Sequence, residues 1–233
     1  MPLNKAKGNM YEFVTHTHNH LAGKCPHACS YCSVQDMAAH YPVLKEKYSG
    51  PLRLVEKEFA VNYGEGKTIF VENCNDLFAG KVPMNMILKV LEHCRKWPRN
   101  AYIFQTKNPF RYGELMQHDF PPDAIIGCTI ESNRDSAIGY APRQSYRGAS
   151  MSHVLPMMKR FITIEPILDF DVESFAEIVK RIRPEFVNIG ADSKNHGLPE
   201  PSIEKVMDLI GLITAAGIEV REKRNLERLK GGD

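Results

Sequence analysis

Short apolar runs alternate with helix-like segments along almost the whole chain, and this order constrains the fold more than any other feature. Strands are predicted at residues 11–18, 68–72, 101–106, 124–129, 160–166, 186–190 and 217–221. Helices are predicted at residues 33–40, 55–62, 84–97, 111–117, 151–159, 172–181 and 202–215, with a long polar loop at 131–150. A run that is apolar at nearly every position, such as 68–72, is typical of a parallel strand covered on both faces. The sequence therefore predicts an α/β fold, a partial (β/α)6-type barrel around a parallel sheet.

The length and composition fit one globular domain. We expect the 233 residues to form a single domain, residues 1–233, with a core at about 11–221 and short tails on either side. No apolar run approaches the ~20 residues of a membrane helix, and the N-terminus lacks the apolar core of a signal peptide. The sequence thus predicts a cytoplasmic protein without membrane contact, whose six cysteines bind metal or are buried rather than paired. The net charge of +2 neither requires nor excludes a nucleic-acid partner.

Three cysteines lie close together in the segment 24–34, KCPHACSYCSV. Three residues separate Cys25 from Cys29, two separate Cys29 from Cys32, and no fourth cysteine follows nearby. Because four thiolates complete the ligation of a [4Fe-4S] cluster, three would leave one iron open. Catalytic metal sites keep an open position whereas structural sites fill it. The spacing therefore indicates chemistry on a molecule bound at that iron.

Two other interpretations of this segment are a zinc site, with His27 or another nearby histidine as fourth ligand, and a disulfide framework. Three further histidines, His16, His18 and His20, recur at alternate positions at the first predicted strand. Side chains at alternate positions of a strand share one face and lie about 6–7 Å apart. This spacing fits packing beneath the cluster, or contact with substrate, better than ligation of a second metal.

Polar side chains follow the predicted strands where each strand ends. In (β/α) barrels the active site is built at the C-terminal ends of the strands, so we expect these side chains to gather at one mouth. They are Glu72, Asn73, Asn75, Asp76, Gln105, Thr106, Lys107, Glu131, Ser132, Asn133, Arg134, Glu165, Asp169, Asp192, Ser193 and Lys194. Glu165 has apolar neighbours on both sides in the run ITIEPIL. A carboxylate in such surroundings needs a partner.

The spacing CxxxCxxC, with Tyr31 directly before the last cysteine, resembles the signature of the radical SAM superfamily. A closer resemblance, to small phage- and prophage-associated radical SAM proteins, is carried by the segments TIFVENCNDLFAGKVP, IFQTKNP, GCTIESN, RFITIEPIL and VNIGADS. That group is itself similar to spore photoproduct lyase and other DNA-photolyase-like members. Its members often have a longer gap between the first two cysteines, whereas this chain has the superfamily's standard spacing. The resemblance covers about residues 11–221.

The resemblance implies a radical SAM enzyme with a partial (β/α) barrel. In that superfamily the open iron of the [4Fe-4S] cluster binds the amino and carboxylate groups of S-adenosyl-L-methionine (SAM). One electron, from an external reductant of the flavodoxin or ferredoxin type, then cleaves SAM to methionine and a 5′-deoxyadenosyl radical that abstracts hydrogen from a substrate. The resemblance thus implies two cofactors, the cluster and SAM, and does not separate a lyase from a transferase.

The resemblance also implies roles for individual residues. The cluster ligands are Cys25, Cys29 and Cys32. The cofactor-binding residues are Tyr31 at the adenine, Glu72, Asn73 and Asn75 at the methionine amino group, Lys107 at the methionine carboxylate, Glu131, Ser132 and Asn133 at the ribose hydroxyls, and Glu165 near the cofactor. Each pairing is chemically sound, because an ammonium needs acceptors, a carboxylate needs a fixed cation and a diol needs a carboxylate or amide.

The remaining cysteines differ in their surroundings. Cys74 follows a strand at the predicted mouth and could donate a hydrogen atom to a substrate radical, as a cysteine does in spore photoproduct lyase. Cys94 lies on the apolar stripe of its helix and Cys128 lies inside a strand. Both are predicted to be core residues.

The substrate is the least constrained part of the prediction. The loop 134–147 interleaves arginines with Tyr140 and Tyr146. This combination can hold a phosphate backbone and stack on a base, or it can serve only to keep an exposed lid soluble. We expect a nucleotide or nucleic-acid substrate. The alternatives are radical modification of a peptide or small metabolite and, in a different class, a zinc-stabilised, non-catalytic nucleic-acid-binding module.

Overall fold

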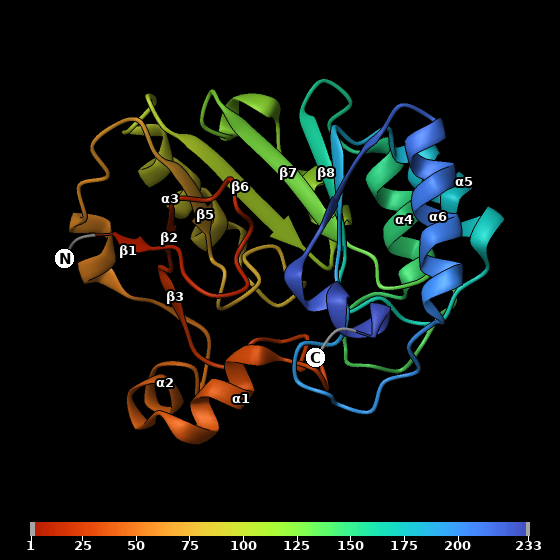
Figure 1. Ribbon diagram of the computed structural model, residues 1–233. Coiled ribbons are helices and arrows are strands. Elements are labelled where there is room, and N and C mark those ends of the chain that lie inside the picture. Colours follow the sequence, from red (N-terminus) through yellow and green to blue (C-terminus); the bar gives the residue numbers. More distant parts are fainter. Residues whose placement is uncertain (1–2, 232–233) are drawn as a thin grey trace.

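The computed structural model describes residues 3–231 and is built around a central sheet (Figure 1). Eight strands pair in the order β1-β2-β5-β6-β7-β8-β9-β10. They are β1 (Asn4–Lys5), β2 (His16–His18), β5 (Thr68–Val71), β6 (Ala101–Thr106), β7 (Ala124–Thr129), β8 (Lys159–Ile164), β9 (Phe186–Ile189) and β10 (Glu219–Glu222). All neighbours from β2 to β10 are parallel, and β1 runs antiparallel to β2 at one edge. A separate antiparallel pair joins β3 (Leu21–Ala22) to β4 (Arg53–Leu54).

The order of the strands makes the sheet open. Within residues 3–231 the strands at its two ends, β1 and β10, do not pair with each other. The α/β class and the parallel sheet that the alternating pattern predicts are therefore confirmed, as a partial rather than a closed barrel. No helix of the described part of the chain is long and apolar enough to cross a membrane.

Helices follow most strands, as the alternation predicts. The α-helices are α1 (Ser33–His40), α2 (Pro42–Lys47), α3 (Met84–Arg95), α4 (Gln144–His153), α5 (Val172–Ile182) and α6 (Ile203–Ala215). The 3₁₀ helices are η1 (Glu56–Ala60), η2 (Pro109–Glu114), η3 (Gln117–Asp119) and η4 (Arg224–Lys230). In Figure 1, α1 and α2 lie apart from the sheet, whereas α4, α5 and α6 stand together beside it.

The two faces of the sheet are covered differently. On the outer face, Ile69 of β5 belongs to the main core, together with Val90 of α3 and Phe175 of α5. Alternate residues of a strand point to opposite faces, and the next residue, Phe70, belongs to a smaller core with Tyr11 of the N-terminal segment. The helices thus cover the outer face, and the N-terminal segment fills part of the concave one.

The first predicted strand is shorter than expected. Residues 11–18 are predicted as one strand, but only His16–His18 forms β2. The reason is that Tyr11 turns onto the concave face, where its hydroxyl bonds Gln105 Oε1 and Thr163 Oγ1, each at 2.7 Å. This smaller core also includes Phe70, Ile103, Phe161 and Phe186 of the strands, and Ile103 and Phe161 precede the polar residues Gln105 and Thr163 of the same strands. The space left on the concave face therefore lies toward the C-terminal ends of the strands.

The prediction of a loop at residues 131–150 is wrong for residues 144–150. There α4 begins at Gln144 and ends at His153, and the helix predicted at 151–159 does not extend beyond that residue. The buried face of α4 consists of Gln144, Arg147, Gly148 and Met151. Half of these residues are polar, so the helix lacks the apolar repeat by which a buried helix is recognised.

Candidate functional site

The three cysteines lie in one loop between β3 and α1, and we call residues 24–32 the cysteine loop. Hydrogen bonds close two turns in it, from the Ala28 amide to the Cys25 carbonyl at 3.3 Å and from the Cys32 amide to the Cys29 carbonyl at 3.2 Å. Cys32 then caps the N-terminus of α1. The three thiols are half-buried, and all six cysteines of the chain are free, which contradicts a disulfide framework.

The cysteine loop does not form a site for a single ion. Among residues 3–231, the one group of three or more potential metal ligands whose ligand atoms lie within 4.8 Å of one another does not include the thiols of this loop or His27. Nε2 of His27 instead bonds Oδ2 of Asp76 at 2.7 Å. Thiolates of a cubane cluster bind separate irons, so they lie farther apart than the ligands of one zinc ion. The donor set therefore fits a cluster better than the zinc site.

The thiols lie close enough to influence one another. Burial raises the pKa of Cys25 to about 12, and Asp76 and the neighbouring Cys29 raise it further. Burial also raises the pKa of Cys29, while Lys107 opposes the rise. Thiols of this kind stay protonated until a metal displaces the proton.

Asp76, which follows β5, fixes the cysteine loop to the C-terminal ends of two strands. Its carboxylate accepts hydrogen bonds from the hydroxyl of Thr106 and the amide of Lys107, each at 2.8 Å, in addition to the bond with His27. Burial alone would raise the pKa of Asp76, but His27 and these donors lower it below its usual range. The carboxylate is therefore ionised and joins the loop to the ends of β5 and β6.

A second attachment comes from residues 138–140, which follow β7. The Ser30 amide donates to the carbonyl of Ile138 at 2.9 Å, and the Tyr140 amide donates to the carbonyl of His27 at 2.6 Å. Between them, a Cβ atom at Gly139 would lie 2.7 Å from that carbonyl oxygen. Only glycine permits so close an approach of the two backbones.

A buried ion pair lies under the last part of the cysteine loop. Oε2 of Glu131, just after β7, is 2.7 Å from Nη1 of Arg147 on α4, and both side chains are at most 2 % exposed. The Tyr31 hydroxyl donates to the same carboxylate. Burial would raise the pKa of Glu131, but Arg147 and Lys107 lower it. Glu131 thus lies beside the loop as predicted, with its oxygens already bound by two partners.

Lys107 presents an ammonium group beside the cysteine loop. Its Nζ lies 5.3 Å from the centre of the Tyr31 ring and has no hydrogen-bond or ion-pair partner among the described residues. Burial would lower its pKa, but Cys29 and Glu131 raise it above the usual value. The result is a fixed cation with free donors, which suits an anionic ligand group.

The amides after β5 lie next to the chain that enters the cysteine loop. Asn73 Oδ1 accepts from the side chain of Asn19 at 2.8 Å, and the Asn75 side chain donates to the carbonyl of Gly23 at 3.1 Å. Between them, the Cys74 amide donates to Asn19 Oδ1 at 2.9 Å. Burial raises the pKa of Cys74, so its sulfur is a thiol. The structure thus brings Asn73, Cys74 and Asn75 to the loop.

The structure places Glu72 elsewhere. Its side chain is buried. The carboxylate accepts hydrogen bonds from Nδ1 of His20 at 2.9 Å and from the Leu21 amide at 3.2 Å. Glu72 also has a positive φ of 61°, which turns the chain there. The carboxylate is therefore held by the segment leading out of β2 instead of facing the cysteines. Of the three residues predicted at the methionine amino group, only Asn73 and Asn75 remain candidates.

Ser132 and Asn133 shape the loop after β7. The Ser132 hydroxyl donates to the carbonyl of Asp169 at 2.7 Å, and Asn133 Oδ1 accepts from the amide of Asp171 at 2.9 Å. Arg134 next to them pairs with Asp169 and Asp171. All three side chains thus hold the segment that leads into α5, and the role of Ser132 and Asn133 at the ribose hydroxyls stays a prediction.

Glu165, at the end of β8, has the partner that its apolar surroundings require. Its Oε2 is 2.6 Å from Nζ of Lys223, and its Oε1 accepts from Asn225 and Asn9, each at 2.8 Å. These partners come from the N-terminal segment and from the chain after β10. Glu165 therefore closes the opposite side of the mouth, and no contact joins it to the cysteine loop.

A polar layer on the concave face was not predicted. Gln105 Nε2 donates to Thr129 Oγ1 at 2.8 Å, and Thr163 pairs in register with Thr129 on one side and Asn188 on the other. The Nδ2 group of Asn188 is buried and has no hydrogen-bond partner among residues 3–231. The signal in the sequence is one polar residue near the end of each of four apolar strands. An unpaired donor at this depth indicates a place for a ligand or water.

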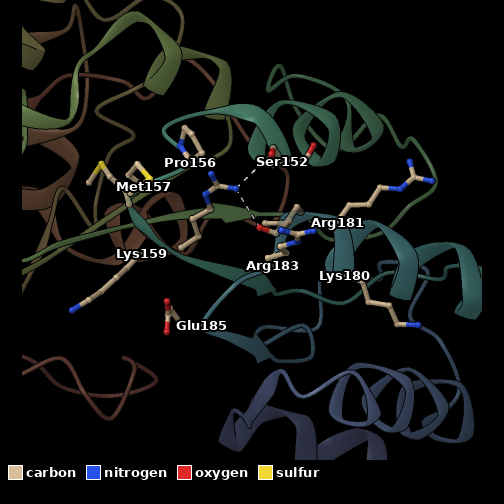
Figure 2. Close-up of a pocket in the computed structure, with 11 residues that line it drawn as sticks. Ser152, Pro156, Met157, Lys159, Lys180, Arg181, Arg183 and Glu185 are labelled. Carbon is tan, nitrogen blue, oxygen red and sulfur yellow. Dashed lines mark hydrogen bonds between the residues drawn. The ribbon is translucent and has the colours of Figure 1, made fainter.

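Two cavities open at the surface. One, of about 750 Å³, lies between the N-terminal segment 6–14 and residues 219–224, with Asn188 in its wall. The other, of about 700 Å³, lies where β8 and β9 begin, at the end of the sheet remote from the cysteine loop. Figure 2 shows that three of its cations, Lys159, Lys180 and Arg181, point in different directions. They do not converge on a common ligand position.

The fold is that of radical SAM enzymes. A variant of spore photoproduct lyase matches with a TM-score of 0.63 at 11% identity, over 94% of this chain and 80% of that chain. A radical SAM methyltransferase from Sphaerobacter thermophilus matches with a TM-score of 0.52 at 15% identity, over 94% and 69%. Streptococcus suis SuiB bound to S-adenosylmethionine matches with 0.52 at 8% identity, over 88% and 49%. The chain spans 63% of the lyase structure with bound AdoMet and dinucleoside spore photoproduct. These similarities, all at 15% identity or less, show that the chain shares its fold with these radical SAM proteins.

The chain belongs to the family described as Protein of unknown function (DUF5131), whose model matches residues 9–178. The matched region includes the cysteine loop and the ends of β5, β6, β7 and β8. No curated protein matches the sequence.

Proposed function

We propose that this chain is a radical SAM enzyme that holds a [4Fe-4S] cluster through Cys25, Cys29 and Cys32. The observation that carries the proposal is the unpaired ammonium of Lys107, 5.3 Å from the centre of the Tyr31 ring and beside the cysteine loop. A fixed cation next to three free thiols is what the carboxylate of an iron-bound SAM requires. When bound, the two cofactors would supply a 5′-deoxyadenosyl radical that abstracts hydrogen from the substrate.

The residues of the chain bind and orient the cofactors. Lys107 holds the methionine carboxylate, and Asn73 and Asn75 accept from the methionine ammonium. Tyr31, fixed by its bond to Glu131, lies at the adenine. Asp76 keeps the cysteine loop against the ends of β5 and β6. An external one-electron reductant of the flavodoxin or ferredoxin type reaches the loop from its exposed side.

Cys74 is the proposed donor of a hydrogen atom to the substrate radical. It lies at the mouth between Asn73 and Asn75, and burial raises its pKa, so it is protonated at neutral pH. The protonated thiol is the form that can donate a hydrogen atom. This proposal predicts that Cys74→Ala cleaves SAM normally and changes the fate of the substrate radical alone.

The proposed substrate class is a nucleotide or nucleic acid. Tyr140 is 84% exposed, and its amide is bonded to the cysteine loop. Phe110 and Tyr146 form an exposed pair with ring centres 6.2 Å apart. Exposed aromatic rings next to a mouth suit base stacking. Structures of the similar spore photoproduct lyase hold a dinucleoside. The loop arginines contribute less than predicted, because Arg134 and Arg147 are paired with carboxylates.

The test of the cluster uses protein reconstituted with iron and sulfide without oxygen. With dithionite and SAM, the wild type should release 5′-deoxyadenosine, measured by liquid chromatography, and Cys29→Ala should not. Cys128→Ala, which removes a buried thiol of β7 outside the loop, is the matched control and should remain active. Zinc in place of iron, or release that survives Cys29→Ala, would contradict the proposal.

Lys107→Ala should weaken SAM binding about 10- to 100-fold, because a charge-assisted hydrogen bond contributes about 1.5–3 kcal/mol. The iron content should stay at the wild-type level. Binding is measured by titrating SAM into the reconstituted protein, with Lys159→Ala, an exposed lysine at the other end of the sheet, as control. Loss of iron would show that Lys107 holds the loop and not SAM.

A further inference from the structure

Three buried histidines form a cluster that the proposed function does not use. His18 ends β2, His20 follows it and His93 lies on α3, and all are at most 3% exposed. One nitrogen from each ring lies within 4.8 Å of the other two. Tyr63 is 1% exposed, and its hydroxyl lies 2.6 Å from Nδ1 of His18 and 3.1 Å from Nε2 of His20. His16, the other histidine of the predicted ladder, is not part of the cluster.

In each ring one nitrogen, here called the inner nitrogen, faces the other two rings, and the other, the outer nitrogen, points away from them. Each outer nitrogen faces a group that can only accept a hydrogen bond. Nε2 of His18 lies 3.2 Å from the carboxylate of Glu58, and Nδ1 of His20 lies 2.9 Å from that of Glu72. Nε2 of His93 lies 3.2 Å from the carbonyl oxygen of Val61. A neutral imidazole carries one N–H, so these contacts place it on the outer nitrogen of every ring.

The inner nitrogens are therefore three lone pairs that face one another. They are Nδ1 of His18, Nε2 of His20 and Nδ1 of His93, and the last two are only 2.9 Å apart. The Tyr63 hydroxyl can donate to one of them, which leaves two acceptors without a donor.

We propose that His18, His20 and His93, with the Tyr63 oxygen as fourth ligand, bind one divalent transition-metal ion, with Zn²⁺ as the best fit. Three imidazole nitrogens and one oxygen complete a tetrahedral zinc site. Binding releases the phenol proton of Tyr63 to solvent, and the ion takes the three nitrogen lone pairs. The bonds to Glu58 and Glu72 match the pattern in which a metal-bound histidine donates its other N–H to a carboxylate.

The proposed site is structural. All four ligands come from the chain and are nearly inaccessible to solvent, whereas catalytic zinc sites keep a position for water. The ion would join the end of β2 to α3 immediately before the cysteine loop begins. It also explains why Glu72 faces the histidines instead of the cysteines. The site is independent of the cluster, because its ligands and those of the cysteine loop are different residues.

The test separates the two metal sites. A variant with Cys25, Cys29 and Cys32 all changed to alanine removes the cluster ligands and leaves the histidines. After chelation this variant is titrated with Zn²⁺, and with Co²⁺ as an optical probe. We expect one equivalent of each to bind, with tetrahedral Co²⁺ absorption bands and a higher melting temperature. If the variant binds none of the ions Zn²⁺, Co²⁺ and Fe²⁺, the proposal is overturned. The radical SAM assignment would then be untouched.

Conservative variants exclude a trivial loss of folding. Gln at His18 or His93 and Asn at His20 keep an N–H at the outer position and remove the inner nitrogen. In the same background, His18→Gln, His20→Asn and His93→Gln should each abolish stoichiometric binding while the circular dichroism spectrum stays the same. Glu72→Gln should weaken binding about 10- to 100-fold. His16→Gln is the control and should bind as the parent does. Unchanged binding in the first three variants would refute the assignment of the ligands.

Discussion

At the scale of single residues, Asp76 connects the cysteine loop to the ends of two strands. One carboxylate joins His27 of the loop to the hydroxyl of Thr106 and the amide of Lys107. The sequence predicts Asp76 only as one of several polar residues after a strand. Its role depends on contacts between residues 49 positions apart, which no local pattern contains.

Asp76→Asn should destabilise the protein by about 1–3 kcal/mol, because the amide NH₂ cannot accept and leaves buried donors unpaired. The pKa of Asp76 is lowered in the folded state, so its contribution is complete above the ordinary carboxyl pKa and is lost as the pH falls through the folded value. Urea unfolding from neutral to acid pH measures both effects. Asp123→Asn, an exposed carboxylate, should change little, and equal stability of the two variants would contradict the role of Asp76.

The pair of Glu131 and Arg147 makes a prediction of a different kind. Arg147→Ala leaves a buried carboxylate without its cation, which typically costs about 3–5 kcal/mol. Replacing both residues, as Glu131→Leu with Arg147→Met, should cost less than the single change, because no buried charge is left alone. The denaturant midpoints of the single and double variants measure the two losses of stability. A double variant that is less stable than Arg147→Ala would show that the pair contributes more than mutual neutralisation.

At the scale of secondary-structure elements, α1 depends on few contacts. None of its residues is buried. His196, in the loop after β9, connects it to the sheet, with Nε2 at 3.1 Å from Asp36 of α1 and Nδ1 at 2.6 Å from Asp192. Because α1 begins directly after Cys32, this connection also supports the cysteine loop.

His196→Ala should loosen α1 and increase amide hydrogen exchange in residues 33–47 while the sheet stays protected. Its bond to Asp192, with a further one to Asp36, raises the pKa of His196. The connection is therefore complete below the ordinary histidine pKa and weakens as the pH rises through the raised folded value. Wild-type exchange in this segment should increase over the same pH range. His118→Ala, at an exposed histidine, serves as control and should show no change.

The elements also show how far the sequence can be read. The strands at 101–106 and 124–129 are confirmed to the residue, and α3 begins at Met84 as predicted, because uninterrupted apolar runs and amphipathic repeats carry their own signal. By contrast, the sequence does not predict the helix α4, since its buried face includes Arg147. A charged side chain can be assigned to the interior from sequence only when its partner is known. His93 is likewise missed, because it meets His20 only after α3 has packed against the sheet.

At the scale of the whole molecule, the concave face is divided into two halves. Aromatic residues around Tyr11 fill the half where the strands begin. The polar layer of Gln105, Thr129, Thr163 and Asn188 follows toward the mouth. Parallel strands place all their C-terminal ends on one edge, which explains why the sequence could predict the mouth residues as a group. It could not predict which of them face the cysteines, because turns such as that at Glu72 reverse a side chain locally.

Tyr11→Phe should test the division of the concave face. The hydroxyl bonds both Gln105 and Thr163, so its removal should cost about 1–2 kcal/mol without changing iron content. Thermal unfolding and metal analysis of the reconstituted protein measure the two quantities. Loss of iron in this variant would mean that the N-terminal segment extends its influence to the cofactor site.

The two attachments of the cysteine loop also bear on when the proposed cluster would be assembled. One comes from Asp76 after β5 and the other from residues 138–140 after β7, so both are made long after the loop itself leaves the ribosome. The thiols reach their final arrangement only when these later parts of the chain have folded around them. We therefore expect the proposed cluster to be assembled on the folded apoprotein and not on a growing chain.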